Sequence, residues 1–404
     1  MSPKKVAIFT SSRSDFGPLR RLIGLCSTAF DLDLLVASLH QQQLYQSATE
    51  IEQYVKDLPL RIVPIAFGLR GTTEQSRVQA ISAAQAQLAD WFAQQHYDAI
   101  VVLGDRWELF AISIAAFLFN IPIAHISGGE ITAGAIDDSI RHAHTKLAHL
   151  HFVANATYAR NVSAMGEEDW RITICGECGL DSIHSNDYAS ADEIQKQFDI
   201  AVTARPILVT YHPSTLDFST SVQEQIDGLL AALDLFPDEL IIFTAPASEK
   251  DAEIITQQIQ AFIEGRKNCR FVAHFGSKNY LAVMRRAKLV IGNSSSGLTE
   301  AASFNIPAIN IGNRQKGRMS AASVIHTNYD ATDIKDAIAH VLAHPAQDWA
   351  ENPYDPYRDG RNSERIVSAL NTALTTLPQD KLLSKNFVIE VNSLDWNSLL
   401  KEFK

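Results

Sequence analysis

A short turn rich in hydroxyl groups follows one of the apolar runs of this chain. The segment from Gly292 to Gly297 reads GNSSSG, and it stands between an apolar stretch and residues that favour a helix. A helix that begins directly after a strand presents free N–H groups and the positive end of its dipole to an anion. The turn therefore predicts a diphosphate site, with Glu300 placed to accept hydrogen bonds from the two hydroxyls of a ribose.

The turn differs from the common phosphate-binding loops. No Gly-Lys-Ser or Gly-Lys-Thr follows it, and the chain lacks a G-x-G-x-x-G fingerprint after a strand. The alternative interpretation is an ordinary Ser- and Gly-rich turn that caps a helix.

Carboxylates follow two other apolar runs. Asp105 could cap the next helix or stand at the floor of a cleft. Asp137 and Asp138 lie beyond Gly128 and Gly129, which allow the backbone to approach a ligand closely. We expect one of these two aspartates to cap a helix and the other to point inward, where a carboxylate shielded from water can act as an acid or a base.

His212 ends another apolar run, and Pro213 holds the chain after it in an extended form. A histidine with a pKa near neutrality is suited to proton transfer or to a hydrogen bond with a departing phosphate. A histidine buried in the core is the alternative.

The basic residues that follow the apolar runs are few. Arg13, Arg106, Arg314 and Lys316 supply local positive charge, and the planar guanidinium of Arg314 can bind phosphate oxygens in a bidentate manner. The whole chain carries a net charge of −11. This balance argues against a nucleic-acid partner or an anionic membrane surface, so an anionic ligand must be met by these local groups.

Metal, redox and membrane functions have little support. A lone C-x-x-C pair and four neighbouring histidines lack the partners and spacing of a metal site, so we expect no metal and no cofactor; these residues are Cys175, Cys178, His142, His144, His149 and His151. The apolar stretches fall short of the roughly 20 residues that span a membrane. The N-terminal residues do not resemble a signal peptide, so a cytoplasmic location is expected.

Short apolar runs alternate with longer amphipathic stretches along the chain. This alternation predicts βαβ units, parallel sheets covered on both faces, and two doubly wound Rossmann-like domains that face each other across a cleft. We place the first domain at residues 1–180, the second at 181–375 and a C-terminal extension at 376–404, with the last helix of the second domain docked on the first. Ten strands are expected, at residues 6–10, 32–37, 99–103, 121–126, 151–154, 207–211, 240–243, 271–273, 289–291 and 308–311.

Six segments together resemble the hydrolysing UDP-N-acetylglucosamine 2-epimerases of bacterial sialic acid synthesis. The resemblance implies a glycosyltransferase-B-type fold with the substrate between the domains. The segments are TSSRSDFG at residues 10–17, LGDR at 103–106, HISGGE at 125–130, IDDSIRH at 136–142, IGNSSSG at 291–297 and NIGNRQKGR at 310–318.

The resemblance also implies a reaction and its residues. UDP-N-acetylglucosamine would lose its C2 proton and expel UDP to give 2-acetamidoglucal, and water would then add with inverted configuration at C2. The catalytic candidates are Asp105, Asp137, His212 and Glu130. The substrate-binding candidates are Arg13, His40, Arg106, Arg141, Ser294, Ser295, Gly297, Glu300 and Arg314. The reaction needs no cofactor, and a homodimer or homotetramer is expected.

One position departs from the family pattern. Many members carry glutamate where this chain has Ser127, and that glutamate is commonly given an acid–base role. Either Glu130 substitutes for it, or Asp105 and Asp137 suffice. The nearest alternative function is the hydrolysing UDP-N,N'-diacetylbacillosamine 2-epimerase of legionaminic acid synthesis. More distant alternatives are a glycosyltransferase and a non-catalytic nucleotide-sugar sensor.

Overall fold

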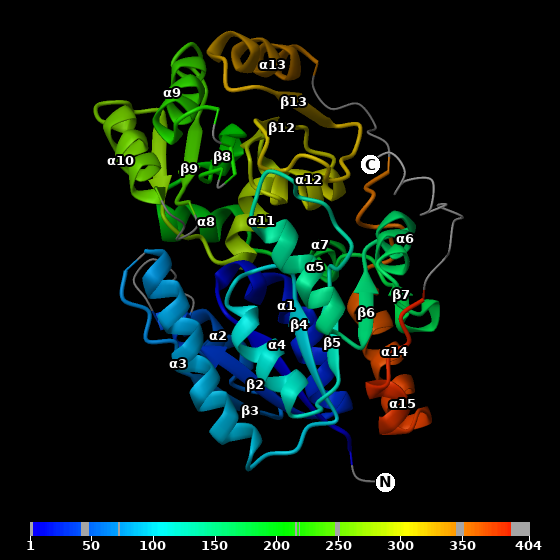
Figure 1. Cartoon of the computed structure of the whole chain (residues 1–404). Coiled ribbons are helices and arrows are strands. Elements are labelled where there is room, and N and C mark those ends of the chain that lie inside the picture. Colours follow the sequence, from blue (N-terminus) through cyan, green and yellow to red (C-terminus); the bar gives the residue numbers. More distant parts are fainter. Residues whose placement is uncertain are drawn as a thin grey trace, which may run out of the picture.

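The computed structural model describes residues 3–41, 48–71, 73–214, 216–217, 219–246, 251–344 and 351–388. Its strands form two parallel sheets, which Figure 1 shows in the lower and upper halves of the molecule. The strands are β1 (Lys5–Thr10), β2 (Asp31–Ala37), β3 (Leu60–Ile65), β4 (Ala99–Leu103), β5 (Ile123–Ile126), β6 (Leu150–Val153), β7 (Ile172–Ile174), β8 (Ile207–Thr210), β9 (Ile241–Thr244), β10 (Cys269–Val272), β11 (Leu289–Gly292), β12 (Ala308–Ile311) and β13 (Val324–Thr327).

The two sheets share one topology. The first has the order β3-β2-β1-β4-β5-β6-β7 and the second the order β10-β9-β8-β11-β12-β13. In each sheet the chain winds outward in one direction and then returns to continue on the other side of the first strand. Such a switch point leaves a crevice at the carboxyl ends of the two central strands, where doubly wound proteins bind their ligands.

Helices cover both faces of each sheet, as the long apolar strands require. The α-helices are α1 (Arg13–Ala29), α2 (Ala48–Val55), α3 (Glu74–Phe92), α4 (Leu109–Leu118), α5 (Asp137–Leu147), α6 (Ala156–Ala164), α7 (Asp181–His184), α8 (Ala191–Phe198), α9 (Val222–Leu233), α10 (Ala252–Ile263), α11 (Ser277–Arg286), α12 (Ser296–Thr299), α13 (Ala331–Ala343), α14 (Asn362–Thr376) and α15 (Gln379–Leu383). None of the described helices is long and apolar enough to cross a membrane.

In the first domain, one core lies under α1, α2 and α14 and the other under α3 and α4. In the second domain, α9, α10 and α13 cover one face and α8 and α11 cover the other. Both arrangements agree with the predicted doubly wound fold.

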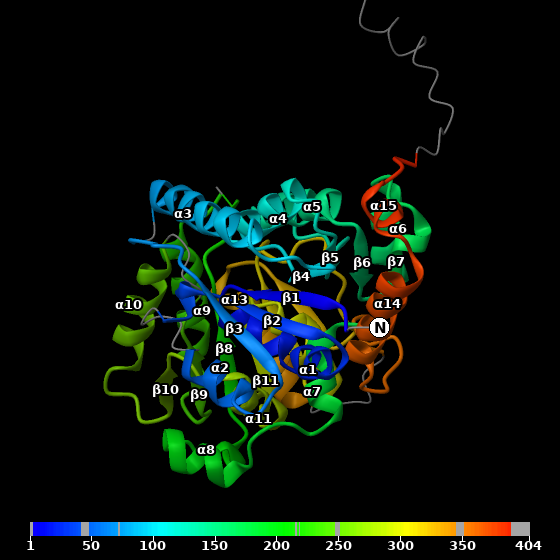
Figure 2. The same ribbon diagram turned by 90° about the horizontal axis from the view of Figure 1, so that it is seen from below.

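The C-terminal helices return to the first domain. Ile366 and Leu370 of α14 share a buried cluster with Leu19 and Leu22 of α1. Beyond α14, Arg171 donates hydrogen bonds to backbone carbonyls of the segment that follows, including those of Leu382 and Ser384. Figures 1 and 2 both show α14 and α15 beside the first sheet, far in sequence from the strands that they flank.

Three strands were not predicted from the sequence. Strand β3 is an edge strand with exposed positions, and it contains Arg61 and Pro64, which are rare inside strands. Strands β7 and β13 are the far edges of their sheets, and they have only three and four residues. Both strands are only partly buried and contain a polar residue, Thr173 in β7 and His326 in β13, so neither shows the continuous apolar run of a buried strand.

Two loops hold the domains in close contact. The N–H of Ala133 donates to the carbonyl of Lys316 at 2.9 Å. Next to it, a Cβ atom on Gly134 would lie only 2.0 Å from the carbonyl oxygen of Asn313. Glycine at residue 134 is therefore required by the approach of the two backbones.

We expect Gly134→Ala to destabilise the protein, because the added methyl group meets backbone that cannot rotate away. Overpacking of this kind lowers the free energy of unfolding by about 1–3 kcal/mol, which can be measured as a lower midpoint of thermal unfolding. Ala133→Ser, at the exposed neighbouring position, is the matched control and should change the midpoint little. An unchanged midpoint for Gly134→Ala would mean that the loops separate freely.

Candidate active site

A cavity of about 220 Å³ lies between the domains at the carboxyl ends of the central strands. Residues that follow β8 and β11 form one wall, and the start of α1 forms another. The polar lining residues from the second domain include Thr210, His212, Thr244, Ser294, Ser295 and Glu300, Ser14 comes from the first domain, and Ser182 of α7 lies just past the boundary between them. The cavity thus lies at the switch point of the second sheet.

The hydroxyl-rich turn after β11 has a tighter form than the sequence predicted. The expected helix is only the four residues of α12, and it continues as a 3₁₀ segment from Ala301 to Phe304. Ser294 Oγ accepts a hydrogen bond from Ser296 Oγ at 3.1 Å. Ser294 and Ser295 both line the cavity, but so short a helix adds little dipole to their hydroxyl groups.

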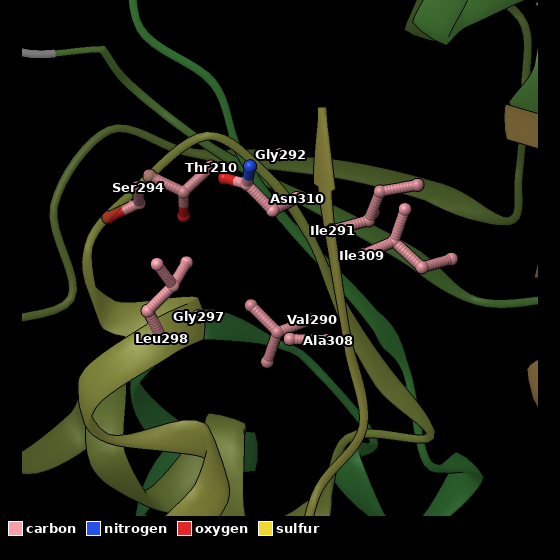
Figure 3. A pocket seen from close by; sticks show the side chains of 10 residues that line it. All are labelled: Thr210, Val290, Ile291, Gly292, Ser294, Gly297, Leu298, Ala308, Ile309 and Asn310. Atoms are coloured by element: carbon pink, nitrogen blue, oxygen red, sulfur yellow. The ribbon is translucent and has the colours of Figure 1, made fainter. Parts of the chain in front are cut away.

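Gly297 lies behind the turn rather than on the main cavity. It lines a cavity of about 10 Å³ between α12 and the second sheet, into which Val290 and Leu298 point (Figure 3). A Cβ atom here would lie 3.6 Å from the Cβ of Ala308, which is ordinary contact. Gly297 therefore lies against the sheet at a position where a small side chain would also fit, and it does not border the main cavity.

Asn293 fixes the segment that carries His212. Its side chain accepts from the His212 N–H at 2.7 Å and donates to the His212 carbonyl at 2.7 Å. This two-point contact joins the loops after β8 and β11 and sets where the imidazole enters the cavity. His212 is partly exposed, so it is not the core histidine that the sequence left open.

Glu300 and Arg314 border the same region from the second domain. Burial raises the pKa of the Glu300 carboxyl, which Thr299 contacts through its hydroxyl group. Arg314 donates to the backbone carbonyl of Asn293 at 3.1 Å, which places its guanidinium beside the turn.

Asp105 forms an ion pair with Arg141 in the first domain. Helix α4 begins only at Leu109, so Asp105 is not the N-cap that the sequence allowed. The Arg141 side chain is fully buried and also donates to the Glu130 carbonyl at 3.0 Å and to Thr132 Oγ1 at 2.9 Å. Arg141 therefore holds Asp105 against the segment that leads to α5, and it does not itself face the cavity.

The two aspartates at the start of α5 have different environments. Asp138 accepts from the Thr132 N–H at 2.5 Å, so it stabilises the preceding turn rather than capping its own helix. Asp137 is half-buried, and its carboxylate makes no hydrogen bond within the described part of the chain. Of the two carboxylates, Asp137 is the one that remains available to a ligand.

Glu130 forms an ion pair with Arg318, which belongs to the second domain. The Glu130 side chain is 2% exposed and that of Arg318 is 11% exposed, so the pair is shielded from water. A buried carboxylate and guanidinium that lose one partner leave an uncompensated charge. The pair therefore ties the two domains together beside the site.

Besides Gly297 and Arg141, three further predicted binding residues lie apart from the cavity or outside the described residues. His40 is fully buried, and its Nε2 lies 3.1 Å from Thr10 Oγ1. Arg106 pairs with the buried Glu108 at 2.6 Å. Arg13 is the first residue of α1, and its side chain lies outside the described residues.

One carboxylate of the site was missed by the sequence analysis. Ser127 Oγ donates to Glu177 Oε2 at 2.8 Å. Burial raises the pKa of Glu177 to about 7, and the neighbouring carboxylate of Glu130 contributes to this rise. Glu177 follows β7, so the rule that polar residues after strands form the site would have included it had that strand been recognised.

A further contact between the domains lies at the start of α11. Glu50 Oε1 accepts from the Ser277 N–H at 3.1 Å, and Glu50 Oε2 lies 3.7 Å from His274 Nε2. Burial by itself would raise the pKa of Glu50, but the hydrogen bonds from His274 and Ser277 outweigh it and hold the pKa at about 2.

The histidines and cysteines form no metal site in the described part of the chain. The four cysteines are free and buried, and burial raises the pKa of the Cys26 thiol to about 12. Burial also lowers the pKa of His125 to about 3 and those of His144 and His149 to about 4, which keeps these imidazoles neutral.

Two Rossmann-like domains with a polar cavity at the strand ends form a glycosyltransferase-B-type fold. A profile of the UDP-N-acetylglucosamine 2-epimerase family matches residues 26–371, and the chain belongs to this family of enzymes.

Curated relatives cover most of the chain. The GDP/UDP-N,N'-diacetylbacillosamine 2-epimerase (hydrolyzing) of Campylobacter jejuni is 30% identical over 96% of this chain and 100% of its own length. The polysialic acid biosynthesis protein P7 of Escherichia coli is 34% identical over 80% of this chain and 82% of its own.

Solved structures share the fold. The UDP-GlcNAc 2-epimerase of Neisseria meningitidis bound to UDP-GlcNAc has a TM-score of 0.75 at 16% identity and covers 91% of this chain and 100% of its own. The enzyme of Methanocaldococcus jannaschii in complex with UDP-GlcNAc and UDP has a TM-score of 0.73 at 16% identity, covering 91% of this chain and 99% of its own.

We expect Glu50→Gln to lower the free energy of unfolding at pH 7 by about 1–3 kcal/mol, because charge-assisted hydrogen bonds to Ser277 are weakened. A folded-state pKa below the usual value of 4.5 gives stability that is present above pH 4.5 and lost as the pH falls towards 2. The difference between variant and wild type, measured in urea, should therefore shrink at pH 2.5. Glu52→Gln, exposed on the same helix, is the control. An equal difference at both pH values would contradict this assignment.

Proposed function

We propose that the protein hydrolyses UDP-N-acetylglucosamine to UDP and N-acetylmannosamine for nonulosonic acid synthesis. The observations that support the proposal are the hydroxyl-lined cavity at the carboxyl ends of β8 and β11 and the ion pair across the domains from Glu130, in the segment between Asp105 and Asp137, to Arg318. Family membership supports the same reaction class.

The second domain would bind the nucleotide. Ser294 and Ser295 would donate hydroxyl hydrogens to the diphosphate, with Arg314 close enough to add its charge. Glu300 would accept from the ribose hydroxyls on the cavity wall. His212 would lie at the leaving phosphate, where an imidazole can donate a hydrogen bond as negative charge develops.

The first domain would supply the proton chemistry. Asp137 would remove the C2 proton, and the C1–O bond would break so that its electron pair leaves with UDP and a C1=C2 double bond forms. Asp105, oriented by Arg141, would hold the sugar and the attacking water. Water would then add its hydroxyl to C1, and a proton would reach C2 on the face opposite to the one that was lost.

A second candidate substrate is UDP-N,N'-diacetylbacillosamine. Two relatives that cover more than nine-tenths of this chain bear the name of that activity, from Campylobacter jejuni and Legionella pneumophila. Against it stands the relative named for polysialic acid synthesis, which is 34% identical.

An assembly and a compartment follow from other features. The described surface of α4 exposes a run of apolar side chains at Ile114, Phe117 and Leu118, with Phe119 directly after the helix. A contiguous apolar surface of this kind suits a homodimer or homotetramer.

Four unpaired cysteines suit a reducing compartment, so we place the enzyme in the cytoplasm.

Incubation with each UDP-sugar, followed by proton NMR, tests the proposal. UDP and N-acetylmannosamine should appear from UDP-N-acetylglucosamine without an added acceptor, and treatment with EDTA should leave the rate intact. Release of a sugar only in the presence of an acceptor would identify a glycosyltransferase, and binding without turnover would identify a sensor. Faster turnover of the diacetamido sugar would select the second candidate.

We expect Arg314→Ala to weaken UDP binding by about 2–3 kcal/mol, because a charge-assisted contact with the diphosphate is lost. Isothermal titration calorimetry measures this change. Lys335→Ala removes a partly exposed positive charge from α13 and is the control for net charge, so its affinity for UDP should equal that of the wild type. Unchanged affinity in Arg314→Ala would exclude this residue from the diphosphate site.

We expect Asp105→Asn and Asp137→Asn each to lose at least about a hundredfold in turnover, the range usual for groups that move protons or position the reacting atoms. Both variants should still bind UDP, since the nucleotide contacts lie in the other domain. Asp227→Asn, exposed on α9, is the control and should retain full turnover. Near-normal turnover in both site variants would remove these aspartates from the mechanism.

A further inference from the structure

Three carboxylates gather around one guanidinium between the domains. The pKa of Glu177 responds to the nearby charges of Glu130, Glu300 and Arg318, which places all four groups in one electrostatic neighbourhood. Arg318 forms its ion pair with Glu130, which accepts from both Nε and Nη2 of the guanidinium. Glu177 is therefore left without that counter-ion.

The backbone of Glu177 is held on both sides. Its N–H donates to the carbonyl of Tyr354 at 2.9 Å, and its carbonyl accepts from Asn362 Nδ2 at 3.0 Å. Gly179, two residues further on, lines the interdomain cavity together with Glu300. The Glu177 side chain therefore starts from a fixed point at the edge of the proposed active site.

The Glu177 carboxyl contacts neutral groups. Oε2 accepts from Ser127 Oγ at 2.8 Å, and Oε1 lies 3.7 Å from the thiol of Cys178. By contrast, Asp105 and Glu130 are each bound by a guanidinium. Within the described residues around the cavity, Glu177 is thus a carboxyl group that can carry a proton without breaking an ion pair.

Ser127 is held in an unusual backbone conformation. It follows β5 directly and has a φ of 62°, in the left-handed region that residues other than glycine rarely adopt. Its N–H donates to the carbonyl of Phe152 at 2.9 Å, so the neighbouring strand fixes it. Backbone strain of this kind is often kept at functional sites. In this conformation the Ser127 hydroxyl donates its hydrogen bond to Glu177.

The protonation of Glu177 suits an acid near neutrality. Burial raises its pKa to about 7, and the carboxylates of Glu130 and Glu300 add to the rise, while the hydrogen bond from Ser127 and the charge of Arg318 oppose it. A group with such a pKa is present in both forms at neutral pH, which favours general acid catalysis.

We propose that Glu177 is the acid that delivers the proton to C2 in the hydration step. The inference rests on the proposed hydrolytic reaction. The π electrons of the C1=C2 bond of 2-acetamidoglucal take the proton of the Glu177 carboxyl, forming the C2–H bond. Water adds its oxygen to the cationic C1 and releases a proton, which restores neutral Glu177. The proton that Asp137 removed in the elimination leaves to solvent with UDP.

The test is Glu177→Gln, an isosteric change that keeps a hydrogen-bonding partner for Ser127. With UDP-N-acetylglucosamine, proton NMR should show UDP release with accumulation of 2-acetamidoglucal, and formation of N-acetylmannosamine should fall at least about a hundredfold. Affinity for UDP should stay within about twofold of the wild type, as expected of a change outside the nucleotide contacts. Glu253→Gln, exposed on α10, is the control with wild-type products.

A second variant separates chemistry from structure. Ser127→Glu in the Glu177→Gln background moves the carboxyl to the position where many members of the family carry glutamate. It should restore N-acetylmannosamine by at least about tenfold over Glu177→Gln alone, which a structural role for Glu177 would not produce. In the wild type, the fraction of product released as 2-acetamidoglucal should rise as the pH rises above 7, since Glu177 then loses its proton.

The outcomes distinguish the two proposals. If the wild-type enzyme releases no UDP from any UDP-sugar, the proposed function fails. If the wild type forms N-acetylmannosamine and Glu177→Gln does so at the same rate, only the role of Glu177 is overturned. Equal loss of UDP release and of both sugar products in Glu177→Gln, with UDP binding intact, also overturns it.

Discussion

The fold depends on how two parallel sheets are brought face to face. Each sheet has its switch point between two central strands, β1 and β4 in the first and β8 and β11 in the second. The buried ion pair between Glu130 and Arg318 joins the segments that follow the neighbouring strands, β5 in the first sheet and β12 in the second. The two domains lie very close together beside this ion pair, because the backbone at Gly134 packs directly against the backbone of Asn313. This approach sets how the candidate residues of one domain face those of the other.

The charge of the site differs from that of the whole molecule. A chain with a net charge of −11 must still attract a ligand with a diphosphate. Arg141 and Arg318 are both engaged by carboxylates of the site, so they organise acidic side chains rather than adding free positive charge. Arg314 lies beside the hydroxyl-rich turn, where its guanidinium would meet the diphosphate of the proposed substrate. Arg141 and Arg318 therefore position carboxylates, whereas Arg314 is the arginine that would bind the phosphate.

Much of the fold could be predicted from apolar runs, because buried parallel strands need continuous apolar sequence. The same rule located Asp105, His212 and Ser294, since each follows a strand. It failed for β7, a partly buried edge strand without a continuous apolar run, and therefore for Glu177. It also overestimated α12, which changes to a 3₁₀ segment and ends at Asn305 in a left-handed conformation before Pro307. The pairs Glu130–Arg318 and Ser127–Glu177 depend on the packing of distant segments, which no local pattern encodes.

The central claim is that a proton leaves C2 of the sugar and a different one returns. Turnover of UDP-N-acetylglucosamine in deuterated water, with the product examined by NMR, measures this directly. The returning proton comes from a carboxyl group that has exchanged with solvent, so the account predicts N-acetylmannosamine with deuterium at C2. Product that retains the substrate's own hydrogen at C2 would contradict the account.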